Sequence, residues 1–132
     1  MVTIIVMAHL EIANALVSCA EHVLAKRVIN LHVIPVRKTE NIEHILNRAE
    51  EFISKLSDER QILLLTDLFG ATPSNIASKL IKPGKIEMIT GLNMPMLLRA
   101  ISYTEYDLQM CVEKAIEGGK NGILHVNGEN IS

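Results

Sequence analysis

The 132-residue chain is poor in the features that mark several classes of protein. It has no Trp, two Phe and two Tyr, so its core must be built from aliphatic residues and Met. A formal net charge of −2 gives no electrostatic reason to expect binding to nucleic acid or to an anionic membrane. The apolar opening stretch has no basic segment before it and soon reaches His9 and Glu11. We therefore expect neither a signal peptide nor direct membrane insertion.

Cysteine is scarce as well. Cys19 and Cys111 form no Cys-x-x-Cys pair, and both fall in segments with helical periodicity. We interpret them as small buried residues in a reducing compartment, where structural disulfides are rare. Length and composition together predict one globular domain in the cytoplasm.

Apolar runs of strand length alternate along the chain with longer segments of helical periodicity. The predicted strands are 2–7, 28–34, 61–66, 86–90 and 122–126. Helices between these strands predict an α/β fold, with a mostly parallel central sheet and helices on both faces. The wholly apolar first strand suits the middle of the sheet, and the second, interrupted by Asn30 and His32, suits an edge. We therefore predict the strand order 2-1-3-4, and the short C-terminal fifth strand fits either edge or a partner subunit.

Capping residues predict where several helices begin and end. Thr72-Pro73 is typical of an N-cap followed by the first helical residue, for a helix that runs to about Ile81. Thr104 and Asp107 predict a capping box for a later helix. That helix should end at Gly118-Gly119, because glycine commonly follows the last turn of a helix.

The candidate site follows from the predicted topology. In such sheets a ligand binds beyond the carboxyl ends of the strands, where the strand order reverses direction. That point lies between the first and third strands, so His9 and Asp67 should emerge side by side. A carboxylate that accepts one imidazole N–H fixes the tautomer and aims the other nitrogen outward. With the helix start at Thr72, which suits a phosphate, this pair matches what phosphoryl transfer requires.

Other parts of the sequence offer weaker candidates. We find no P-loop, glycine-rich dinucleotide turn or cluster of metal ligands, and we predict no cofactor and no metal. None of the other four histidines has a carboxylate placed beside it by the topology. These are His22, His32, His44 and His125. Leu68 and Phe69 either fold inward or, with Leu10, form a patch for docking another protein. Both alternatives avoid the cost of leaving large apolar residues in water, and we favour docking because Leu10 lies near them.

Several stretches resemble the mannose-type IIA component of the bacterial phosphoenolpyruvate-dependent sugar phosphotransferase system (PTS). They are the His9 strand, TDLFGATPSN at 66–75, ITGLNMPML at 89–97 and GKNGI at 119–123. The resemblance implies a single IIA phosphocarrier domain over residues 1–126, followed by a polar tail at 127–132. It also implies a phosphotransferase component that works through a phosphohistidine intermediate.

In that family the phosphoryl group is received from an HPr-type phosphohistidine protein and passed to a IIB partner or used as a regulatory signal. The resemblance implies that His9 carries the group and that Asp67 orients its ring. The phosphoryl oxygens would be held by Gly70, Ala71 and Thr72. It further implies a separate IIB component, and a homodimer that exchanges the last strand.

The chain departs from the family pattern beside the histidine and in the phosphate loop. Ala8 and Leu10 flank His9 where the family usually has Ser or Thr and then Gly, and Ala71 replaces the second of two glycines. Three rival functions stay open. The phosphotransfer subunit of dihydroxyacetone kinase shares the fold and the chemistry. A flavodoxin-like nucleotide or flavin module would need a longer loop after the first strand and more aromatics, and a metal-dependent hydrolase would need a third ligand.

Overall fold

The computed structural model describes residues 1–129, so the last three residues of the predicted tail 127–132 lie outside the described residues. Within the described chain four parallel strands form one sheet in the order β2-β1-β3-β4. They are β1 (Thr3–His9), β2 (Leu31–Val36), β3 (Ile62–Thr66) and β4 (Ile86–Thr90). The predicted α/β class and the order 2-1-3-4 are confirmed.

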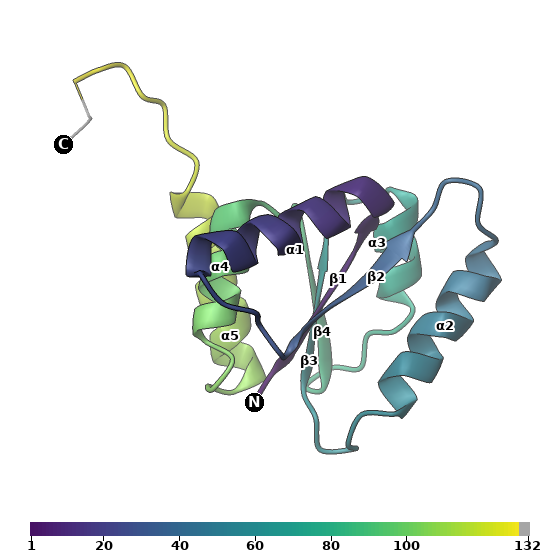
Figure 1. Cartoon of the computed structure of the whole chain (residues 1–132). Coiled ribbons are helices and arrows are strands. Elements are labelled where there is room, and N and C mark those ends of the chain that lie inside the picture. The colour runs from purple at the N-terminus through teal and green to yellow at the C-terminus, as the bar shows by residue number, and fades with distance from the viewer. Residues whose placement is uncertain (130–132) are drawn as a thin grey trace.

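Helices cover both faces of this sheet (Figure 1). They are α1 (Leu10–Leu24), α2 (Ile42–Ser54), α3 (Thr72–Ser78), α4 (Met94–Ser102) and α5 (Leu108–Asn121). Ile4, Val6 and Ala8 of β1 pack into the core under α1, α4 and α5, and Ile5 and Met7 pack into the core under α2 and α3. Because alternate residues of a strand point to opposite faces, this explains the unbroken apolar run at the start of the chain.

Helix α3 differs from the prediction at both ends. Thr72 is its first residue rather than its N-cap, and Ala71 occupies the cap position without a side-chain hydrogen bond. The helix ends at Ser78 instead of about Ile81. Residues 79–81 continue it only as a tighter turn, in which each N–H donates to the carbonyl three residues earlier.

Helix α5 begins and ends later than the capping box predicted. Asp107 is its N-cap and accepts a hydrogen bond from the Met110 N–H at 2.8 Å, while buried Thr104 donates to the carbonyl of Ile101. The helix passes through Gly118-Gly119 to Asn121. A Cβ on Gly118 would lie 2.6 Å from the Cβ of Arg99, so this glycine serves close packing against α4 and does not end the helix.

The two cysteines lie in helices, as predicted, but only one of them is buried. Cys111 packs in the core, and burial raises the pKa of its thiol to about 11. The prediction for Cys19 is wrong, because its side chain is exposed. The buried face of α1 passes through Ala13 and Ala20, and Cys19 lies off that face.

The predicted fifth strand is not formed within the described chain. Residues 123–127 follow α5 as an extended segment that leaves the body of the molecule, where it is drawn in yellow (Figure 1). Ile123 and Leu124 are 76% and 72% exposed. Strand β4 consequently keeps one edge of the sheet without a neighbouring strand among residues 1–129.

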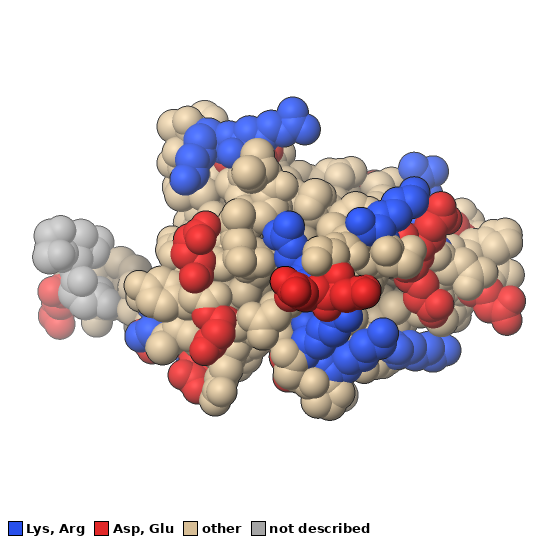
Figure 2. Space-filling model, turned by 90° about the horizontal axis from the view of Figure 1, so that it is seen from below, with Lys and Arg blue, Asp and Glu red and all other residues tan. Residues whose placement is uncertain are grey.

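The surface on the side of the N-terminus carries acidic and basic side chains over the same face (Figure 2). This mixture fits the small net charge of the chain. None of the helices within residues 1–129 is long and apolar enough to cross a bilayer.

Candidate functional site

His9 and Asp67 meet at the carboxyl edge of the sheet. His9 is the last residue of β1, and Asp67 directly follows β3. The two strands are neighbours, with Met7 in register with Thr66, so both side chains leave the sheet at the same end. The structure thus brings together the two residues that the strand order placed there.

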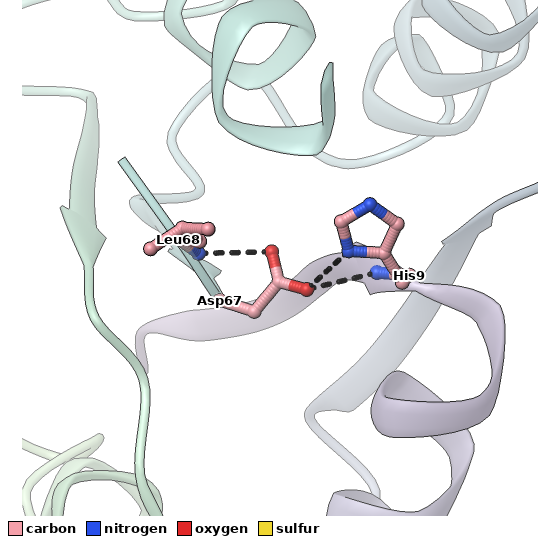
Figure 3. Close-up of polar contacts among 3 residues, drawn as sticks. All are labelled: His9, Asp67 and Leu68. Atoms are coloured by element: carbon pink, nitrogen blue, oxygen red, sulfur yellow. Dashed lines mark hydrogen bonds and ion pairs between the residues drawn. The ribbon is translucent and has the colours of Figure 1, made fainter. Parts of the chain in front are cut away.

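The two side chains are joined by a short hydrogen bond (Figure 3). Nδ1 of His9 lies 2.6 Å from Oδ2 of Asp67, and the backbone N–H of His9 donates to the same oxygen at 3.2 Å. Oδ1 of Asp67 accepts from the backbone N–H of Leu68 at 3.0 Å. An ionised carboxylate only accepts hydrogen bonds, so Nδ1 carries the proton. The other ring nitrogen, Nε2, points away from the carboxylate and keeps its lone pair.

His9 and Asp67 differ in burial and in charge. The side chain of Asp67 is only 10% exposed, whereas that of His9 is 47% exposed. Burial is the strongest single influence on the pKa of Asp67 and acts to raise it. The hydrogen bonds from the ring and backbone of His9, with its charge, outweigh burial and hold the pKa of Asp67 below its usual value. Asp67 is therefore a fixed anion at neutral pH, beneath an accessible imidazole.

Position at a helix start does not explain the exposed ring. His9 is also the N-cap of α1, but its side chain makes no capping hydrogen bond. A purely structural histidine in this place would be expected to cap the helix or to bury its ring. The His9 ring instead contacts Asp67 and is about half exposed, and an accessible ring is what a nucleophile requires.

The predicted phosphate loop lies close to this pair, but one of its backbone N–H donors is already used. Thr72 is exposed and lines the same cavity as His9. Gly70 has a φ of +85°, a conformation that favours glycine. The backbone N–H of Ala71 donates to the carbonyl of Leu68 at 3.2 Å, so this donor is already used inside the loop.

The predicted docking residues lie at the surface. Leu68 and Phe69 are 63% and 78% exposed, and Leu10 is half-buried. The alternative in which Phe69 folds into the core is therefore wrong for this structure. Both exposed residues belong to the loop that directly follows Asp67, whose carboxylate contacts His9.

Sequence reasoning missed two cationic residues at the site. Arg37 and Lys38, in the loop after β2, line the cavity that contains His9 and Thr72. The signal was available, because β2 neighbours β1 and the loops that follow both strands share one edge of the sheet. Only the loops after the first and third strands entered the prediction.

The other histidines lie apart from this pair. His32 is half-buried in β2, with its ring centroid 5.0 Å from that of Phe52. Burial, and then the charge of Arg60, lowers the pKa of His32. His22 and His44 are exposed on their helices, and His125 lies in the extended segment after α5.

Similar proteins identify the family of this chain. The family model described as "PTS system fructose IIA component", EIIA-man, matches residues 3–116. The PTS system fructose-specific EIIA component of Bacillus subtilis is 28% identical over 107 residues, which are 80% of this chain and 73% of that protein. The PTS system mannose-specific EIIAB component of Escherichia coli is 28% identical over 125 residues. That match covers 92% of this chain but only 38% of the longer relative.

Solved structures show the same fold. Phosphotransferase system component EIIA from Streptococcus agalactiae superposes with a TM-score of 0.84 at 26% identity, covering 95% of this chain and 97% of that one. The mannose/sorbose-specific IIA subunit from Enterococcus faecalis gives a TM-score of 0.87 at 15% identity, over 99% and 98% of the two chains. Because the family model matches most of the length of the chain, the chain belongs to the EIIA-man family of PTS IIA components.

Proposed function

We propose that this protein is a cytoplasmic phosphoryl carrier that accepts a phosphoryl group on Nε2 of His9. The donor is an HPr-type phosphohistidine protein, and the acceptor is a separate IIB component. The observation that carries this proposal is the 2.6 Å contact between His9 and Asp67 at the carboxyl edge of the sheet. Membership of the EIIA-man family supports a carrier role in a sugar PTS.

The transfer step uses the free lone pair of His9. Nε2 attacks the phosphorus of the donor phosphohistidine, and a new N–P bond forms as the donor's N–P bond breaks. The bonding electrons return to the donor imidazole. The proton on Nδ1 stays in the hydrogen bond to Asp67, whose negative charge stabilises the positive charge that develops on the ring. In the second transfer a nucleophile of the IIB partner attacks the phosphorus, and the bond between phosphorus and Nε2 of His9 breaks.

The phosphoryl oxygens lie against the loop that opens α3. Thr72 contributes to the lining of the cavity that His9 also lines, and its hydroxyl would donate to a phosphoryl oxygen. Gly70 supplies the turn that brings Thr72 to this edge. Since the Ala71 N–H is bonded to Leu68, Ala71 contributes by shaping the turn rather than by donating.

Protein partners dock on the apolar rim formed by Leu10, Leu68 and Phe69. Transfer between two histidines requires close approach and exclusion of water, which favours an apolar surface around a polar centre. The exposure of Leu68 and Phe69 supports this assignment, because side chains at the surface can contact a partner and are not needed for the core. The relatives' names suggest that the sugar is fructose or mannose.

A homodimer completes the proposal. The extended segment 123–127 exposes Ile123, Leu124 and Val126, and β4 has an edge without a neighbouring strand in the described chain. A cavity of about 430 Å³ lies beside β4, lined in part by Met88 and Ile89. Pairing of this segment with the sheet of a second copy would bury its apolar residues and satisfy the strand edge.

The experiment that tests the proposal is a reconstituted relay. The full chain is incubated with phosphoenolpyruvate, enzyme I and HPr, and its intact mass is measured before and after. We expect a gain of one phosphoryl group per chain that is labile in acid and stable in alkali, as a phosphoramidate is. No gain in mass with a competent relay would contradict the proposal.

A further inference from the structure

The loop after β2 lies on the side of His9 away from Asp67. In the sheet β1 has β3 on one side and β2 on the other. Val36, the last residue of β2, is in register with His9, and Arg37 and Lys38 follow at once. The two cationic residues therefore leave the sheet beside His9, across from the carboxylate that holds its ring.

A cavity joins these residues to the nucleophile. It has a volume of about 540 Å³, and His9, Arg37, Lys38, Glu40 and Thr72 contribute to its lining. A water molecule in the liquid occupies about 30 Å³, so the cavity has room for a phosphoryl group and several waters. Asp67 holds Nδ1 of His9, which leaves Nε2 as the ring nitrogen that can carry this group.

The cavity carries an excess of positive charge. Arg37 and Lys38 are exposed, and within residues 1–129 neither forms an ion pair. Glu40 is the carboxylate of the lining, and it is paired with Arg48 of α2. The hydrogen bond from Arg48 is the main cause that lowers the pKa of Glu40, and the charge of Arg37 lowers it as well, so this one carboxylate faces three cations. Glu40 therefore does not cancel the charges of both Arg37 and Lys38.

The turn that presents the two cations is anchored at both ends. The backbone N–H of Glu40 donates to the carbonyl of Arg37 at 3.1 Å, which closes the turn. Nη2 of Arg48 donates to the carbonyl of Pro35 at 2.7 Å, and Nη1 donates to Glu40. Because these contacts use backbone groups and Glu40, the side chains of Arg37 and Lys38 stay available for a ligand.

We propose that Arg37 and Lys38 bind the phosphoryl oxygens of phosphorylated His9. This inference rests on the proposed function and adds the cationic half of the phosphate site. A guanidinium offers paired N–H donors to phosphate oxygens, and an ammonium adds a point charge. Both cations favour the dianion of the phosphoryl group over its protonated form. They also supply donors at a site where Ala8 provides no hydroxyl beside the histidine.

The test compares two double variants with the same change in charge. The cavity variant is Arg37→Gln with Lys38→Gln, and the control is Lys26→Gln with Arg27→Gln. Lys26 and Arg27 form an exposed pair before β2, at the opposite end of that strand. His9 is phosphorylated with phosphoramidate, a small donor that needs no protein docking. The initial rate is measured, and the pKa of the phosphoryl group is followed by ³¹P NMR.

We expect the cavity variant to react about three- to tenfold more slowly than wild type, in line with two solvent-exposed charge contacts. Its phosphoryl pKa should rise, because two nearby cations have been removed. The control should match wild type in both measurements. Single variants Arg37→Gln and Lys38→Gln, each checked for a native melting temperature, should show intermediate effects.

Three outcomes would overturn the inference, and they separate it from the proposed function. If wild type is not phosphorylated on His9 by either phosphoramidate or HPr, both proposals are wrong. If it is phosphorylated and the cavity variant keeps its rate and phosphoryl pKa, only the role of Arg37 and Lys38 is wrong. A rate loss seen with HPr but not with phosphoramidate would also overturn it, because the cations would then serve partner docking.

Discussion

The two sides of His9 are built in different ways. On the β3 side Asp67 is nearly buried, and both of its oxygens accept hydrogen bonds from a ring or backbone N–H. On the β2 side Arg37 and Lys38 are exposed, and only the turn beneath them is anchored. A buried, saturated contact fixes a tautomer and a ring orientation, whereas exposed cations adapt to a group that arrives and leaves. The difference suits a carrier, which must hold its nucleophile permanently and its cargo briefly.

Removing the fixed side should have the larger effect. Asp67→Asn keeps the shape of the side chain but removes the charge that holds the Nδ1 proton. We expect phosphoryl transfer to His9 to slow by about tenfold or more, as loss of an orienting partner does at other sites. Stopped-flow or quenched-flow transfer from phosphorylated HPr measures this rate. Asp58→Asn, which alters an exposed acidic residue, is the matched control. A wild-type rate in Asp67→Asn would remove Asp67 from the mechanism.

The phosphate loop contributes Thr72 to the cavity that His9 lines, and its contribution should be smaller than that of Asp67. Thr72→Ala removes the hydroxyl of a residue that lines the His9 cavity. We expect a loss of about two- to tenfold in transfer rate, which corresponds to one hydrogen bond. Thr72→Ser should restore most of the rate, because it keeps the hydroxyl. Equal losses in the Ala and Ser variants would point to packing by the methyl group instead.

The apolar rim should affect docking without affecting stability. Phe69 is 78% exposed, so Phe69→Ala should keep a near-native melting temperature and raise the Michaelis constant for phosphorylated HPr. Phe52→Ala is the contrasting variant, because Phe52 packs against the core under α2. This substitution should lower the free energy of unfolding by about 2 kcal/mol or more. Thermal denaturation and steady-state kinetics on both variants separate the effects. A large drop in melting temperature for Phe69→Ala, with unchanged donor kinetics, would contradict the docking assignment.

The smallest expected effect concerns acid stability. The folded-state pKa of Asp67 lies below its unfolded value of about 3.9, so its contribution to stability is present above that pH. This contribution is lost as the pH falls through the folded-state pKa. The difference in unfolding free energy between wild type and Asp67→Asn should therefore shrink below about pH 4. Urea denaturation at pH 7, 5 and 3 measures it, and a constant difference would show that Asp67 is not stabilised in the fold.

The sequence was enough to predict the parts of the fold that depend on local pattern and strand order. The unbroken apolar run of β1 indicated a central strand, and the polar interruptions at Asn30 and His32 indicated an edge. From that order the meeting of His9 and Asp67 follows, because parallel strands end at a common edge. For Leu68 and Phe69 the sequence left inward folding and docking open, and the exposure of both side chains agrees with the favoured alternative.

Other features depend on contacts that no local pattern reveals. Gly118 resembles a helix stop in the sequence, but close packing against Arg99 explains it. Thr104 and Asp107 are both suitable N-cap residues, but Thr104 is buried and Asp107 caps the helix. Residues 122–126 have the composition of a strand, yet within the described chain they form none, although β4 has an edge without a neighbouring strand. The prediction missed Arg37 because it considered the loops after β1 and β3 and left out the loop after β2.

The most direct test of the account is to determine which nitrogen of His9 carries the phosphoryl group. The full chain, labelled with ¹⁵N in its histidines, is phosphorylated through HPr and examined by two-dimensional NMR of the imidazole rings in alkaline solution. Since Asp67 holds Nδ1 in a 2.6 Å hydrogen bond, the account predicts phosphorylation at Nε2 of His9 and at no other histidine. A phosphoryl group on Nδ1 of His9, or on another histidine, would contradict it.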